Sequence, residues 1–231
     1  SAVARFVAPL IAIDYSPTAI LSAVERHLQV SRSRQTAVFV AESQSVVDKY
    51  VRVLSREMES VAVSVEGLLL SDLTRRDFDA QGYLAGSTRI LTSLGLLQQV
   101  REGLRAHAVD VPVSVVFTEL TLSAIERIGA IPPSQVVLVL TEERHRGSVV
   151  GLLKSYLPGS NLKFPASLNP DELQETLIGC SVLVYTLGVQ SIVSSLDTVG
   201  VETILMEYQL REDALVTLKA SFERAHRELV A

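Results

Sequence analysis

Tryptophan is absent from this chain of 231 residues, only 5% of the residues are aromatic, and there is a single cysteine, Cys180. So few aromatic side chains argue against a carbohydrate-stacking cleft and against an aromatic platform for single-stranded nucleic acid. One cysteine cannot form a disulfide within the chain, and a cysteine-ligated metal site is not expected. We therefore expect no metal, and a reducing, cytoplasmic compartment.

A basic excess and long apolar runs are also missing. The chain has 21 Lys and Arg against 26 Asp and Glu, a net charge of −5, so these residues alone are not expected to bind DNA. No apolar run approaches the ~20 residues that span a bilayer, and the first residues do not form a signal peptide. We expect no membrane partner. The phosphate-binding patterns G-x-x-x-x-G-K-[ST] and G-x-G-x-x-G are absent too, so no nucleotide cofactor is expected.

Short apolar runs alternate with helical stripes along most of the chain. Residues 36–41 predict a strand, and residues 43–58 predict a helix, because Val47, Tyr50 and Leu54 recur at three- and four-residue spacing. Further strands are predicted over residues 61–70, 88–92, 111–117, 136–140, 162–166, 182–185 and 203–208. Strands that alternate with helices predict right-handed βαβ units and mainly parallel sheets.

The two halves of the chain resemble one another. Residues 90–95 (Ile-Leu-Thr-Ser-Leu-Gly) match residues 183–188 (Leu-Val-Tyr-Thr-Leu-Gly), and residues 111–120 match residues 201–210. The pattern predicts an α/β fold of two similar Rossmann-like lobes, periplasmic-binding-protein-like, with a ligand cleft between them. A single wide sheet without duplication is the alternative. The predicted division is a linker with one helix at 1–31, a first lobe at 32–128 and a second lobe at 129–231.

Polar residues gather where the predicted strands end, and ligands of open α/β sheets bind outside those carboxyl ends. The candidate ligand-binding residues are Glu42, Ser43, Thr92, Ser93, Thr118, Glu119, Glu142, Arg144, Tyr185, Thr186 and Tyr208. Ser93 and Thr186 each lead into a helix, where a hydroxyl and free backbone N–H groups favour an anion. They can equally be ordinary helix caps. We expect a small, anionic metabolite and no cofactor.

A catalytic role is the alternative. Glu42 and Glu142 could act as acid and base in a two-lobed racemase or isomerase. Such enzymes with catalytic cysteines carry one after a strand in each lobe, whereas Cys180 precedes its strand and has no counterpart in the first half. We expect a buried, structural Cys180 and no catalytic residue. His145, between Arg144 and Arg146, could meet an anion or lie at a solvated helix start.

A family resemblance adds to these observations. Residues 5–9 (Arg-Phe-Val-Ala-Pro) resemble the end of the wing in GntR-type winged-helix regulators, and residues 32–228 are similar to the bilobed effector domains of some such regulators. The similarity to these effector domains is clearest in residues 132–139 and 180–188. The resemblance implies a small-molecule-sensing domain of a bacterial transcriptional regulator, in which an absent N-terminal winged helix binds the DNA.

The last predicted helix bears on assembly. From Glu212 onward, apolar residues recur at three- and four-residue spacing: Leu215, Leu218, Phe222, Ala225 and Leu229. We expect Leu215 and Leu218 to cover the second sheet, and the distal residues to lie in a dimer interface or on the first lobe. Regulators that read two-fold operators are dimers, so a homodimer is predicted.

Overall fold

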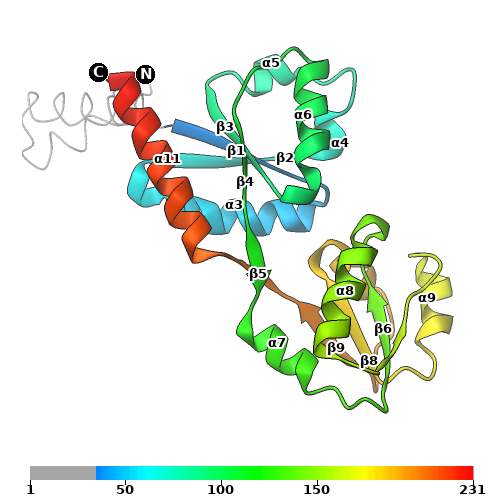
Figure 1. Ribbon diagram of the computed structural model, residues 1–231. Coiled ribbons are helices and arrows are strands. Elements are labelled where there is room, and N and C mark those ends of the chain that lie inside the picture. Colours follow the sequence, from blue (N-terminus) through cyan, green and yellow to red (C-terminus); the bar gives the residue numbers. More distant parts are fainter. Residues whose placement is uncertain (1–34, 231) are drawn as a thin grey trace, which may run out of the picture.

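The computed structural model describes residues 35–230 and forms two lobes, one above the other in Figure 1. The strands of the first sheet are β1 (Gln35–Ala41), β2 (Val63–Leu69), β3 (Ser87–Thr92) and β4 (Val113–Val115). Those of the second are β6 (Val136–Leu140), β7 (Asn161–Lys163), β8 (Val182–Thr186) and β9 (Glu202–Met206). The orders are β2-β1-β3-β4 and β7-β6-β8-β9, parallel throughout. This repeated topology confirms the predicted fold of two similar lobes and excludes the single wide sheet.

The first sheet is covered on both faces. Ala37 and Phe39 of β1 face α3 (Gln44–Met58), while Val38 and Val40 face the opposite core. That second core is closed by α4 (Leu70–Leu73), α5 (Ala80–Tyr83) and α6 (Leu97–Ala106). Burial on both faces explains why β1 is an almost uninterrupted apolar run.

The second sheet follows the same plan. Val137 and Val139 of β6 face α7 (Leu122–Gly129) and α8 (Arg146–Tyr156), and Leu138 faces α9 (Pro170–Leu177) and α10 (Gln190–Val193). Helix α9 begins as its sequence predicts, because the side chain of Asn169 accepts a hydrogen bond from the backbone N–H of Asp171 at 3.0 Å.

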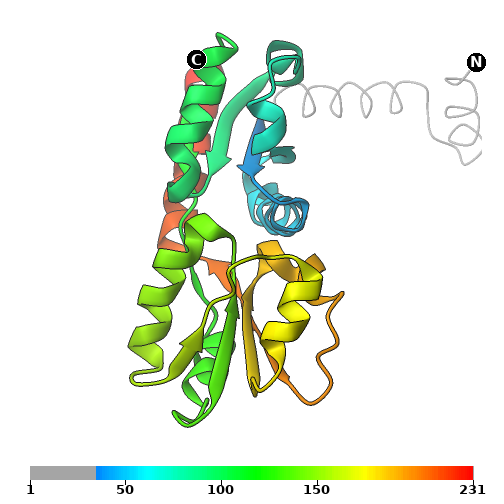
Figure 2. The same cartoon turned by 90° about the vertical axis from the view of Figure 1, so that its right-hand side faces the viewer.

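The chain crosses between the lobes twice, along one short antiparallel ribbon. Strands β5 (Thr118–Leu120) and β10 (Tyr208–Leu210) pair with each other and lie between the two sheets in Figures 1 and 2. The single strands predicted over 111–117 and 203–208 are therefore each interrupted near the crossing, where the chain leaves one sheet for the ribbon.

Each crossing strand is followed by a helix that packs on the lobe it has just reached. Helix α7 buries Ala124 and Ile128 in the core of the second lobe. Helix α11 (Glu212–Val230) returns to the first lobe, where Leu218 and Phe222 are buried beside Phe39. The packing corrects the predicted division at 128/129, since α7 belongs to the second lobe and α11 to the first.

The expected placement of α11 is corrected in the same way. Leu215 and Leu218 pack on the first lobe instead of the second sheet, and Phe222 takes the first-lobe alternative. Segment 1–31 and the side chain of Leu229 lie outside the described part of the structure. None of the helices described is long and apolar enough to cross a membrane.

Candidate functional site

A cleft of about 360 Å³ lies between the two lobes, at the carboxyl ends of both sheets. The chain leaves neighbouring strands β1 and β3 in opposite directions, and it does the same at β6 and β8. Such switch points are where open α/β sheets bind ligands. Among the predicted site residues, those that line the cleft are Glu42, Ser43, Ser93, Thr118, Glu142, Thr186 and Tyr208.

The other predicted site residues do not line the cleft. Thr92 is fully buried, and its hydroxyl donates to the carbonyl of Val40 at 3.0 Å within the sheet. Glu119 is exposed on the ribbon and accepts from the side chain of Gln209. Tyr185 packs against the α9 and α10 side of the second core. Arg144 remains near the site only through its ion pair with Glu42.

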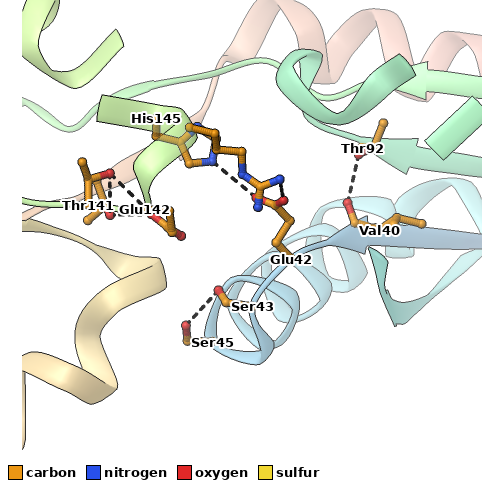
Figure 3. Close-up of polar contacts among 10 residues, drawn as sticks. Val40, Glu42, Ser43, Ser45, Thr92, Thr141, Glu142 and His145 are labelled. Carbon is orange, nitrogen blue, oxygen red and sulfur yellow. Dashed lines mark hydrogen bonds and ion pairs between the residues drawn. The ribbon is translucent and has the colours of Figure 1, made fainter. Parts of the chain in front are cut away.

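Glu42 joins the two lobes across the cleft. It follows β1 in the first lobe, and its Oε1 pairs with Nη1 of Arg144 from the second. The other oxygen, Oε2, lies 3.5 Å from Nε2 of His145, which Figure 3 shows reaching toward it. Partial burial lowers the pKa of Arg144 from its usual value, because desolvation disfavours the charged form. Glu42 therefore makes an interlobe contact rather than presenting a free carboxylate to the cleft.

Glu142 stays within its own lobe. The hydroxyls of Thr186 and Thr141 donate to its Oε2 at 2.9 and 3.4 Å. Its Oε1 lies against Gly188, where an added Cβ would overlap the carboxylate. Gly188 belongs to the 3₁₀ turn η4 (Leu187–Val189), so the protein's own carboxylate occupies the helix start that follows β8.

The corresponding helix start in the first lobe is open. Ser93 precedes the 3₁₀ turn η2 (Leu94–Leu96), which runs into α6, and its side chain makes no capping hydrogen bond. A Cβ added at Gly95 would meet no atom within 4 Å. Of the two Ser/Thr-Leu-Gly segments, only the one in the second lobe has a carboxylate packed against its glycine.

Lys49 and Tyr50 are cleft residues that were missed because they lie on a helix rather than at a strand end. Lys49 lies on α3 one helical turn after Val46, which also lines the cleft, so both face the same side of the helix. Its Nζ donates to the carbonyl of Tyr208 at 2.9 Å and pairs with Glu207 at 3.2 Å. Burial raises the pKa of Tyr50 to about 12. Helical spacing along α3, which begins directly after the predicted site residue Ser43, was the available signal for both.

Cys180 is buried, as expected. Its Sγ donates to the carbonyl of Thr176 at 3.4 Å. Desolvation raises the pKa of the thiol and outweighs the opposite effect of Lys163, so the thiolate required of a nucleophile is disfavoured. Within residues 35–230, no three His, Cys, Asp or Glu side chains are grouped to hold a metal ion.

Comparisons with known proteins bear on the fold. No protein-family model matches the chain, and no curated protein matches it significantly. Among solved structures, an ABC domain from Streptococcus pneumonia in complex with L-Trp superposes with a TM-score of 0.52, at 12% identity over 85% of this chain and 83% of that one. The chain shares its two-lobed α/β fold with that domain.

Two further solved structures are similar at lower scores. A Caulobacter myo-inositol binding protein bound to myo-inositol gives a TM-score of 0.41, at 15% identity over 74% of each chain. An ABC transporter solute binding protein from Mycobacterium smegmatis with bound glycerol gives 0.45, at 11% identity over 69% of this chain and 70% of that one.

Proposed function

We propose that this chain is the small-molecule-sensing domain of a bacterial transcriptional regulator of the GntR type. The observation that carries the proposal is the interlobe cleft, because both sheets contribute their carboxyl ends to it. Its volume of about 360 Å³ falls in the ordinary range for metabolite pockets, about 300–1,000 Å³. A similarly folded domain, the one from Streptococcus pneumonia, holds L-Trp.

The ligand in this proposal is a small metabolite with an acidic group. Ser93 and Gly95 form the open helix start on the first-lobe side, and that is where the acid would bind. In the second lobe Glu142 already holds the equivalent position. The anionic character expected from the sequence is therefore assigned to one end of the ligand only.

Sensing would follow from the two-lobed arrangement. A ligand that touches both walls of the cleft favours the lobe arrangement in which both contacts form. In a cytoplasmic homodimer, that bias would pass to winged-helix heads that bind DNA. The wing-like residues 5–9 and the similarity of the body to GntR-type effector domains support this part of the proposal.

Ligand binding can be tested by native mass spectrometry of the chain after incubation with a bacterial metabolite extract. We expect one small molecule to remain bound. The Ser93→Trp variant should abolish binding by filling the cleft, whereas Val199→Trp, at a residue 91% exposed and outside the cleft lining, should not. Failure to capture any molecule, or equal loss in both variants, would contradict a ligand site in this cleft.

The regulatory part needs a separate test. The full gene product should protect DNA flanking its own gene in footprinting, and the captured molecule should shift the protein concentration that gives half protection. Residues 1–231 alone should not bind random duplex at physiological salt, because the chain is acidic. A full gene product that protects no DNA with or without the molecule would overturn the regulator proposal.

The enzyme alternative rests on Glu42 and Glu142, which both line the cleft. A racemase needs a carboxylate that is free to take a proton from the substrate. The ion pair with Arg144 occupies the carboxylate of Glu42, which is therefore not free to approach a substrate. Incubation of the captured molecule with the protein in D₂O distinguishes the two functions: a binding domain leaves its C–H bonds unexchanged, whereas a racemase introduces deuterium.

A further inference from the structure

We propose that the cleft recognises a primary ammonium group, and that the carboxylate of Glu142 binds it. The inference rests on the proposed function, since it names the ligand class of the same site. Together with the acidic group placed in the first lobe, it describes an amino-acid-like ligand with an apolar body.

The first step is the charge of Glu142. None of the ion pairs among the described side chains includes the carboxylate of Glu142. Its contacts are two neutral hydroxyls, from Thr186 and Thr141. A carboxylate in a partly enclosed cleft is stabilised by an opposite charge, because the cleft walls solvate it less well than water does.

The second step is that the cations near the cleft already have partners. Arg144 pairs with Glu42, and His145 faces the other oxygen of the same carboxylate. Lys49 is held by Glu207 and by the backbone carbonyl of Tyr208. To neutralise Glu142, one of these side chains would have to give up an existing contact, so the compensating charge is expected from the ligand.

The third step is the geometry of the carboxylate itself. Both hydroxyls donate to Oε2, and no described group donates to Oε1, which lies over Gly188. Glu142 comes from the second lobe, and Figure 3 shows it apart from the Glu42–His145 contact. Among the described residues Oε1 thus accepts no hydrogen bond, and an ammonium offers three N–H groups for a charge-assisted one.

The remaining cleft wall suggests the rest of the ligand. That wall is mixed: Phe39, Val46, Val116, Val149 and Met206 are apolar, and the polar side chains are Ser43, Lys49, Tyr50, Thr118, His145, Ser148 and Tyr208. The apolar side chains offer no hydrogen bonds, so that part of the wall suits an aliphatic or aromatic group. A molecule with an ammonium group toward Glu142, an acid toward Ser93 and an apolar side group between them matches all three surfaces.

Isothermal titration with matched probes tests the ammonium on the unaltered chain. One set is leucine, 3-methylbutylamine and 4-methylpentanoate, and the other is phenylalanine, 2-phenylethylamine and 3-phenylpropanoate. In each set the second probe lacks the acid and the third lacks the ammonium. We expect the third probe to bind at least about tenfold more weakly than the amino acid, the loss typical of a hydrogen bond to a charged group.

Two variants assign the effect to its residue. Glu142→Gln should weaken the amino acid and the amine about tenfold or more, and should leave the acid probe unchanged or strengthened. Glu143→Gln is the matched control, because Glu143 is the next residue and its exposed side chain pairs with Arg146 outside the cleft lining. Thermal unfolding of both variants checks that the fold is retained; if Glu142→Gln does not fold, the probe series on the unaltered chain decides.

Three results would overturn the inference. The first is binding of the acid probes as tight as that of the amino acids. The second is amino-acid binding that Glu142→Gln and Glu143→Gln change equally. The third is capture, from the metabolite extract, of a molecule without an amine while no probe binds; that outcome leaves the proposed function standing. Capture of no molecule at all instead contradicts the proposed function.

Discussion

Glu42 and Glu142 follow corresponding strands in two lobes of the same topology, yet their carboxylates make different contacts. Glu42 crosses the cleft to Arg144 and His145. Glu142 turns back onto the helix start of its own lobe, beside Thr186 and Gly188. The same backbone frame thus supplies an interlobe contact in one half and a charged cleft wall in the other.

The cause of the difference lies in the residues that follow each glutamate. Glu142 is followed by a short turn, η3 (Glu143–His145), that presents two basic side chains to the facing lobe. Glu42 is followed by the uncharged residues Ser43, Gln44 and Ser45, and Ser45 adds a further cross-lobe hydrogen bond to the carbonyl of Leu187 at 3.2 Å. The two lobes thus share a fold but differ in the charged residues that follow these two strands. This difference gives the two walls of the cleft different charges.

The largest effect is expected where α11 closes the first lobe. Phe222→Ala removes a fully buried ring and should lower the free energy of unfolding by about 3–5 kcal/mol. Val216→Ala, on the exposed side of the same helix, should change it by less than about 0.5 kcal/mol. Urea denaturation gives both values.

Hydrogen exchange on the Phe222→Ala variant compares the stability of the two lobes. In Phe222→Ala, protection should fall in β1 of the first lobe and persist in β6 of the second, because α11 packs only on the former. Equal loss of protection in both strands would show that the lobes unfold as one unit.

The packing of α7 on the second lobe and of α11 on the first could not be predicted from the sequence, whereas many of the strands could. The central strands of both sheets were predictable because they are buried on both faces and read as apolar runs, as Val136–Leu140 does. The ribbon was not, because Thr118–Leu120 pairs with residues about 90 positions away. Local periodicity carries no information on such pairing, and the positions of α7 and α11 depend on it.

The same distinction applies to the candidate site, where the sequence predicted several of the residues but not the contacts that they make. Strand ends located Glu42, Ser93, Glu142 and Thr186, because a parallel sheet brings its carboxyl ends to one edge. They could not reveal that Glu42 meets Arg144, since that contact depends on how one lobe faces the other. The charge carried by each wall of the cleft follows from such contacts and required the structure.

A second contrast concerns the helices that follow β1 and β6. Helix α3 buries Tyr50, whereas α8 buries only Val149 and Leu153. Desolvation raises the pKa of the Tyr50 phenol from 10.0 to about 12. The neutral phenol therefore contributes stability that is fully present below pH 10 and is lost as the pH rises from 10 toward 12.

The alkaline loss amounts to roughly 2–3 kcal/mol, as two units of pKa imply. Denaturation at a series of pH values should show this decline in the wild type and not in Tyr50→Phe. The variant's own stability at pH 7 serves as its reference. An identical decline in both proteins would mean that Tyr50 is not the titrating group.

A smaller effect should distinguish the two Ser/Thr-Leu-Gly segments. Gly188→Ala places a methyl group on the Glu142 carboxylate and should cost about 1–2 kcal/mol. Gly95→Ala meets open space in the other lobe and should stay within about 0.5 kcal/mol of the wild type. Chemical denaturation of the pair measures the asymmetry.

A double-mutant cycle tests whether the Glu142 carboxylate causes the difference in stability between Gly188→Ala and Gly95→Ala. In a Glu142→Ala background the methyl group at Gly188 no longer meets a carboxylate, so its cost should fall below about 0.5 kcal/mol. If Gly188→Ala costs the same with and without Glu142, the glycine is required by its own backbone and not by the carboxylate.

The smallest expected change in stability belongs to the contact between Glu42 and Arg144, but its effect on shape should be visible. Arg144→Gln removes a pair whose partner is only 16% exposed, so we expect a loss near the upper end for such pairs, about 1 kcal/mol. Because this pair joins the lobes, small-angle scattering should show a larger radius of gyration without ligand. Arg146→Gln is the matched control: it breaks a contact with Glu143 within the second lobe and should leave the scattering unchanged. Equal expansion of both variants, or none in either, would show that the ion pair does not hold the lobes together.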